Sequence, residues 1–86
     1  DDIQSQTAAS LAKIDTLLTA ANLTRDAVCF AQILLADIDD FAAMNEVYGA
    51  WVDAIEVKPA RAAFAAAGLP ANARIEIVIQ AIDNNS

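Results

Sequence analysis

The chain has 86 residues, a formal net charge of −7 and a hydrophobic content of 57%. This hydrophobic content excludes a disordered chain, and the length predicts one domain over residues 1–86. Because the five basic residues are scattered and no histidine is present, the composition disfavours nucleic acid as a partner and excludes zinc sites and histidine-based triads. Any chemistry is therefore left to carboxylates, Arg61 and water.

The first predicted element is a helix capped by Asp1 or Asp2. Apolar residues recur at helical spacing, at Ile3, Leu11, Ile14, Leu17, Leu18 and Ala21. Asn22 tolerates the left-handed conformation common just past a helix end, so the helix should end there, with Leu23 folding back on its last turn. A solvated face is expected at Gln4, Gln6, Lys13 and Asp15.

Residues 27–36 predict a strand, because they are rich in branched and aromatic side chains and too apolar for a surface helix. Both of its faces are apolar. One face would hold Val28, Phe30 and Leu34, and the other Cys29, Ala31, Ile33 and Leu35. Helices can cover only one side of so small a sheet, so we expect the other side to meet another copy of the chain.

The compartment is indicated by the single cysteine and by the hydropathy pattern. Cys29 cannot form an internal disulfide, and its apolar neighbours predict a buried position, so a reducing, cytoplasmic setting is expected. Apolar runs are shorter than a membrane span, and the opening Asp1-Asp2 lacks the features of a signal peptide. We therefore expect a soluble protein that does not bind membranes.

A second helix is predicted from Asp39 to about Val52. Three aspartates among residues 37–40 lie at its start, and capping explains them better than a calcium loop, whose ligands spread over about a dozen residues. An apolar row typical of a core follows at Phe41, Met44, Tyr48 and Trp51. Asn45 lies beside this row, either pointing toward a cleft or exposed to solvent.

The last part of the chain predicts a β-hairpin. Residues 60–67 and 74–82 flank a segment whose Gly68, Pro70 and Asn72 permit a reversal, with Ala67 opposite Arg74. Alternation along the strands divides the side chains between two faces. The predicted core face holds Phe64, Ile75, Ile77 and Ile79. The predicted second face holds Arg61, Ala63, Ala65, Glu76, Val78 and Gln80.

The second face of this hairpin suits a small carboxylate ligand, because it places a cation and an anion among small residues. In the predicted register, Arg61 and Glu76 lie roughly 13 Å apart. They are too distant to share one small substrate within a chain, so we expect them to meet across a subunit boundary. The alternative is a solvated pair worth about 0 to 1 kcal/mol.

Several segments of the α-β-α-β-β order resemble the Rid family, the YjgF-like reactive intermediate deaminases also called liver perchloric-acid-soluble proteins. These segments are residues 40–51 (DFAAMNEVYGAW), Pro59-Ala60-Arg61, Leu69-Pro70 and Ile75-Glu76-Ile77. The opening residues 1–28 are similar to that family's first helix and the turn after it. Together they match the carboxy-terminal two-thirds of the family.

The resemblance implies a trimer of a chorismate-mutase-like α+β fold, with two helices on one face of a mixed sheet and ligand clefts between subunits. It implies that Arg61 grips a substrate carboxylate, Glu76 positions the attacking water and Asn45 lines the cleft, with no metal or organic cofactor. The implied activity is hydrolysis of 2-iminobutanoate or 2-aminoacrylate to a 2-keto acid and ammonia. The alternatives are a non-catalytic carboxylate binder or, against the acidic charge, an endoribonuclease or translation inhibitor.

The chain departs from the family in two respects. Ala63 stands where the family often has cysteine, so any role of that thiol is absent. The family also begins with about forty residues of strands that this chain lacks. The chain is therefore expected to be a fragment whose first part is cleaved, separate or unresolved, or else a truncated relative.

Overall fold

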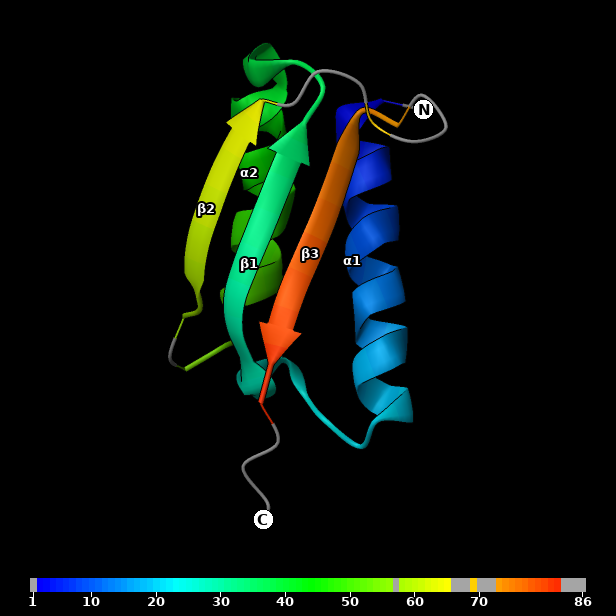
Figure 1. The fold of residues 1–86 in the computed structure, drawn as a ribbon, viewed down its shortest axis with the longest axis vertical. Helices are drawn as coiled ribbons and strands as arrows, with labels where there is room; N and C mark the ends of the chain where they lie inside the picture. Colours follow the sequence, from blue (N-terminus) through cyan, green and yellow to red (C-terminus); the bar gives the residue numbers. More distant parts are fainter. Residues whose placement is uncertain (1, 57, 66–68, 70–72, 83–86) are drawn as a thin grey trace.

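Two helices packed on one face of a three-stranded mixed sheet form the fold (Figure 1). The computed structural model describes residues 2–56, 58–65, 69 and 73–82. The elements in chain order are α1 (Ile3–Ala20), β1 (Val28–Leu35), α2 (Phe41–Val52), β2 (Ala60–Ala65) and β3 (Ile75–Ala81). The predicted α-β-α-β-β order is therefore confirmed.

The sheet has the strand order β2-β1-β3, so the predicted hairpin between β2 and β3 is wrong. β1 pairs parallel with β2 and antiparallel with β3. The chain passes through α2 between β1 and β2, a crossover that makes these strands parallel. β3 then takes the other edge of β1, whose apolar side chains suit the central position. Of the predicted turn, Gly68, Pro70 and Asn72 lie outside the described residues, as does Ala67.

Three rows of paired residues turn toward the helices: Ala31 with Arg61 and Ile79, Ile33 with Ala63 and Ile77, and Leu35 with Ala65 and Ile75. The β1 members of these rows are fully buried, which identifies the core face. The prediction that the three β3 isoleucines face the core is confirmed. Arg61, Ala63 and Ala65 share that face with them, which corrects the predicted division.

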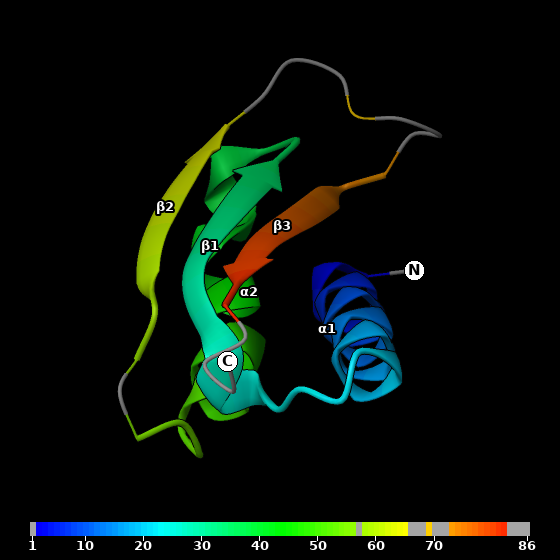
Figure 2. The ribbon, with the colours of Figure 1, turned by 60° about the horizontal axis from the view of Figure 1, so that its bottom comes forward.

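The opposite face of the sheet carries the other predicted hairpin residues. Leu34 pairs with Phe64 on one side and with Glu76 on the other, and the next rows hold Val78 and Gln80. Phe64 is 43% exposed, so its predicted core position is wrong. The error follows from the topology, because the faces of β2 and β3 are each set by pairing with β1. Figure 2 shows that neither helix covers this face, which we call the open face.

Helix α1 begins and ends as predicted. Asp2 Oδ1 accepts a hydrogen bond of 2.7 Å from the Ser5 backbone N–H, and this bond lowers the pKa of the Asp2 carboxyl. Asn22 adopts a left-handed φ of 61°, and the Leu23 N–H donates to Leu18 O at 2.8 Å. Leu17, in contrast, is 69% exposed, so its assignment to the apolar side is wrong.

The polar side of α1 is only partly solvated, because α2 and Arg74 lie beside it. Gln4 donates to Ala43 O and Glu46 Oε1, both at 3.2 Å. Gln6 Oε1 accepts from the Arg74 backbone N–H at 2.9 Å. Asp15 is likewise engaged, in an ion pair described below. Among the four residues predicted to be solvated, Gln4 and Lys13 are exposed, whereas Gln6 and Asp15 are partly buried.

The expectations for α2 agree with its structure. Met44, Tyr48 and Trp51 are buried, and Phe41 packs against the same core at the start of the helix. Asp37 accepts a hydrogen bond of 2.9 Å from the Asp39 N–H, so its side chain caps the short turn that precedes α2. The core row is therefore confirmed, and the capping role predicted for the aspartates is confirmed at Asp37.

Two further observations concern the features used to infer the compartment. Cys29 is exposed, which corrects the predicted burial, because an irregularity in the pairing between Val28 and Phe30 turns it outward. Its thiol lies 3.4 Å from Gln80 O. Across the described part of the chain, neither helix is both long and apolar enough to cross a membrane.

Candidate functional site

Arg61, near the start of β2, extends its side chain across to α2. Its Nη1 donates to Asn45 Oδ1. Its guanidinium carbon lies 5.3 Å from the ring centroid of Phe41 and 5.4 Å from that of Tyr48. Because residues four and three apart lie on one face of a helix, α2 presents all three partners together. We call Phe41, Asn45, Tyr48 and Arg61 the Arg61 cluster.

The Nε and Nη2 atoms of Arg61 have no hydrogen-bond partner among the described residues. These atoms form one edge of the guanidinium, and two parallel N–H groups on such an edge match the two oxygens of a carboxylate. The side chain is exposed, so the edge is accessible in the single chain. The structure thus brings Arg61 and Asn45 into contact, with chemistry suited to a small carboxylate.

Glu76 does not share this site within one chain. It pairs with Leu34, whereas Arg61 pairs with Ala31, and the two side chains project from opposite faces of the sheet. Three residues along the strands and two strand spacings separate them, which is roughly 10 Å in each direction. The predicted single surface carrying both groups is therefore wrong, because it depended on a hairpin that does not form.

Tyr48 belongs to both the core and the Arg61 cluster. It is 4% exposed, and its hydroxyl has no hydrogen-bond partner within the described segments. Burial raises the pKa of this hydroxyl, and the nearby charge of Arg61 opposes that change. From the sequence, Phe41 and Tyr48 are predicted only as core residues, although their spacing from Asn45 already places all three on one face.

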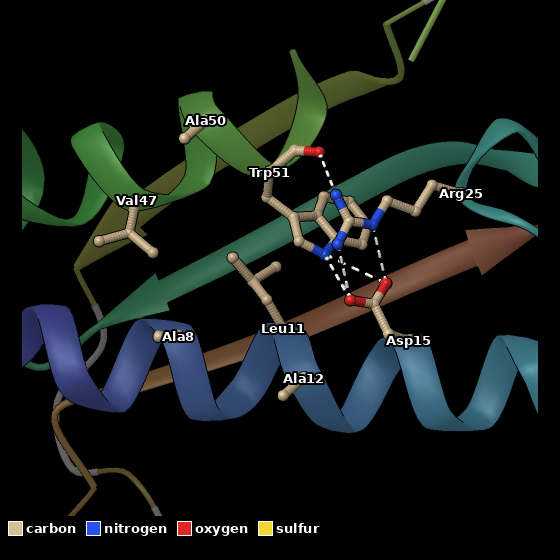
Figure 3. A pocket seen from close by; sticks show the side chains of 8 residues that line it. All are labelled: Ala8, Leu11, Ala12, Asp15, Arg25, Val47, Ala50 and Trp51. Carbon is tan, nitrogen blue, oxygen red and sulfur yellow. Dashed lines mark hydrogen bonds and ion pairs between the residues drawn. The ribbon is translucent and has the colours of Figure 1, made fainter. Parts of the chain in front are cut away.

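A second cluster, missed from the sequence, joins α1 to α2 (Figure 3). Arg25 donates from Nε and Nη2 to the two oxygens of Asp15 at 2.9 and 2.8 Å, and from Nη1 to Trp51 O at 2.8 Å. Its guanidinium carbon lies 4.7 Å from the Trp51 ring centroid, and the indole N–H donates to Asp15 at 3.2 Å. We call Asp15, Arg25 and Trp51 the Arg25 cluster.

The Arg25 cluster borders a hollow of about 370 Å³ between the helices. The residues lining it are Ala8, Leu11, Ala12, Asp15, Arg25, Val47, Ala50 and Trp51. Hydrogen bonding to Arg25 is the main reason that the pKa of Asp15 is lowered, and the same pairing raises the pKa of Arg25. Since the charges satisfy each other, this hollow offers a ligand no free ionic partner among its lining residues.

Comparisons with known proteins match nearly the whole chain. A family model described as Endoribonuclease L-PSP matches residues 1–83. A goat 2-iminobutanoate/2-iminopropanoate deaminase is 43% identical over 68 residues, covering 79% of this chain and 48% of the goat protein. A RutC family protein of Pyrococcus horikoshii is 41% identical over 76 residues, covering 88% of this chain and 59% of its own length.

Solved structures agree with these sequence matches. The crystal structure of Escherichia coli TdcF with bound serine superimposes with a TM-score of 0.91 at 30% identity, covering 96% of this chain and 66% of TdcF. The chain spans about half the length of the two curated relatives described above, the goat deaminase and the Pyrococcus horikoshii protein.

Proposed function

The chain belongs to the endoribonuclease L-PSP family, which includes RutC and reactive intermediate deaminase proteins. We propose that it catalyses the hydrolytic deamination of small reactive imines. Its fold is the chorismate-mutase-like α+β fold of the YjgF structures. The observation that carries the proposal is the open Nε/Nη2 edge of Arg61 beside Asn45. The goat deaminase and the serine bound to TdcF support a small ligand with a carboxylate.

In this reaction Arg61 holds the carboxylate of a 2-imino acid, such as 2-iminobutanoate, through two parallel hydrogen bonds. Glu76 aligns a water molecule. The water oxygen attacks the C=N carbon while the Glu76 carboxylate takes a proton from the water. The nitrogen is protonated, the C–N bond breaks, and one water has converted the imino acid into a 2-keto acid and ammonia. Each step uses only side chains and water.

Because Arg61 and Glu76 lie on opposite faces of one sheet, the proposal places them together across a boundary between copies of the chain. A homotrimer with clefts between subunits provides such boundaries. The open face supports this assembly, since Phe64 and Val78 are each 43% exposed on it and β1 adds partly buried apolar residues. Light scattering should give the mass of a trimer, and a fully active monomer would contradict the shared cleft.

A non-catalytic carboxylate binder is the second candidate. It is favoured by the position of Glu76, because the Arg61 cluster provides a carboxylate contact while no carboxylate of the described residues is placed beside it to activate water. Ribonuclease activity, which the family description names, is disfavoured by the net charge of −7 and by the scarcity of basic side chains to hold phosphates.

Glu76→Gln separates the enzyme from the binder. We expect imine hydrolysis to fall by about 10²-fold, the usual scale for a lost general base, while affinity for 2-ketobutyrate stays within about threefold. A threonine dehydratase generates the imine in situ, keto acid release gives the rate, and calorimetric titration gives the affinity. The exposed Glu56→Gln is the matched control. Hydrolysis that survives in Glu76→Gln would show that Glu76 is not the general base. Imine hydrolysis no faster with the wild-type protein than without it, at retained 2-ketobutyrate affinity, would favour the binder.

A further inference from the structure

Two arginines in this molecule are held in the same manner, and among the described residues only one of them has a carboxylate partner. In the Arg25 cluster, the guanidinium lies over an indole ring, Nη1 donates to a carbonyl oxygen, and the Nε/Nη2 edge holds Asp15. In the Arg61 cluster, the guanidinium lies beside the rings of Phe41 and Tyr48 and Nη1 donates to Asn45 Oδ1. Its Nε/Nη2 edge has no partner among the described residues.

We infer that Phe41 and Tyr48 are positioning residues, which hold Arg61 with its Nε/Nη2 edge already directed at the place where a ligand carboxylate binds. The identity of that ligand as a small 2-keto or 2-imino acid rests on the proposed function. The orientation of the guanidinium rests on the contacts alone.

The need for such positioning follows from where Arg61 lies. β2 is an edge strand, the arginine side chain is exposed, and a long side chain in that situation samples many rotamers. Each aromatic contact at an exposed site changes an equilibrium by about two- to fivefold, so two contacts change it by roughly 4- to 25-fold. Ordering the guanidinium before binding removes that loss of freedom from the binding step.

The residues of α2 restrict different movements of the Arg61 guanidinium. Asn45 fixes the rotation of the guanidinium, since it accepts from Nη1 and leaves the opposite edge free. Phe41 and Tyr48, on the preceding and following turns, limit its movement across the helix surface. The Tyr48 hydroxyl has no partner in the described part of the chain, so its ring face is the feature that the inference uses.

The test measures the order of the Arg61 Nε–H bond by ¹⁵N relaxation in the ligand-free protein. We expect high order in the wild type and a clear loss in Phe41→Leu and in Tyr48→Leu, which keep apolar bulk but remove a ring. Tyr48→Phe is the conservative variant and should keep the order of the wild type. The Nε–H of Arg25 in the same spectra is an internal control, and Leu17→Ala, at an exposed position of α1, is the control variant.

Calorimetric titration of 2-ketobutyrate into the same variants connects order to binding. Phe41→Leu should weaken the affinity by about fivefold, and Tyr48→Phe should restore most of the affinity that Tyr48→Leu loses. Unchanged Nε–H order in Phe41→Leu would overturn the inference, as would lost order with unchanged affinity. If the wild type shows the ordered guanidinium but does not bind 2-ketobutyrate, the positioning stands and the proposed function fails. Should Tyr48→Leu not fold, Phe41→Leu decides alone.

Discussion

The Arg25 and Arg61 clusters use similar parts for different purposes. Both guanidiniums contact aromatic rings and both donate Nη1 to an oxygen of α2. The chain supplies a carboxylate to Arg25, and the resulting ion pair ties α1 to α2. It supplies none to Arg61 among the described residues. An arginine held in this way is therefore structural where a carboxylate of the chain fills its Nε/Nη2 edge. The same residue type is available for a ligand where that edge is open.

The largest expected effects come from replacing the two arginines one at a time, because one replacement should change ligand affinity and the other should change stability. Arg61→Ala should weaken 2-ketobutyrate binding by at least 100-fold, because two charge-assisted hydrogen bonds are lost, with a loss in unfolding free energy of no more than about 1 kcal/mol. Arg25→Ala should lower the unfolding free energy by about 1 to 2 kcal/mol and leave affinity within twofold. Urea denaturation and calorimetric titration measure both quantities.

Lysine variants sharpen this contrast. Arg61→Lys should remain a poor binder, because an ammonium cannot reproduce the two parallel hydrogen bonds of a guanidinium edge. If Arg25→Ala weakened the ligand as strongly as Arg61→Ala does, the division between a structural and a binding arginine would be wrong.

Freeing the Nε/Nη2 edge of the Arg25 guanidinium from Asp15 should produce the next largest effect. Asp15→Ala removes the carboxylate, and we expect a loss of about 1 to 2 kcal/mol in the free energy of unfolding. Formate can then occupy the vacated edge, and at ten times its dissociation constant it restores about 1.4 kcal/mol. Thermal denaturation with increasing formate measures this rescue.

Two controls accompany the formate experiment. Sodium chloride at equal ionic strength corrects for general salt effects, and Asp26→Ala changes an exposed aspartate next to Arg25 in the sequence. Equal stabilisation of the wild type and Asp15→Ala by formate would show that the guanidinium edge does not select a carboxylate.

The smallest expected effect is the dependence of the Arg25 cluster on pH. The folded-state pKa of Asp15 is lowered, chiefly by its hydrogen bonds to Arg25, below an unfolded value of about 3.9. Its contribution is therefore present above about pH 4 and is lost as the pH falls through the folded pKa. With the pair a third exposed, we expect a difference below about 1 kcal/mol between the wild type and Asp15→Asn at pH 7, shrinking on acidification.

Unfolding free energies from pH 7 to pH 3 measure this difference. The pKa of Asp2 is also lowered, by the Ser5 backbone N–H, so its contribution has the same sign and is common to both proteins. A stability difference that grows on acidification would mean that Asp15 is not held as the ionised partner of Arg25.

Features that depend on neighbours along the chain could be predicted from the amino-acid sequence. Asp2 caps α1 through Ser5, and Asn22 ends the same helix in a left-handed conformation. The spacing of Met44, Tyr48 and Trp51 predicted the buried side of α2, because a helix fixes which residues share a face. Asn45 and Arg61 were singled out from motifs, and the structure brings them into contact.

The pairing of the strands and the faces that they share could not be predicted from the sequence, because both depend on tertiary packing. A turn at Gly68 to Asn72 is compatible with a hairpin, yet β3 gains more by pairing with the apolar central strand β1. Because side chains alternate with a period of two, that choice alone determined that Arg61 and Glu76 lie on opposite faces. The Arg25 cluster joins residues 10 and 26 positions away from Arg25, a proximity that arises only when α1 packs against α2.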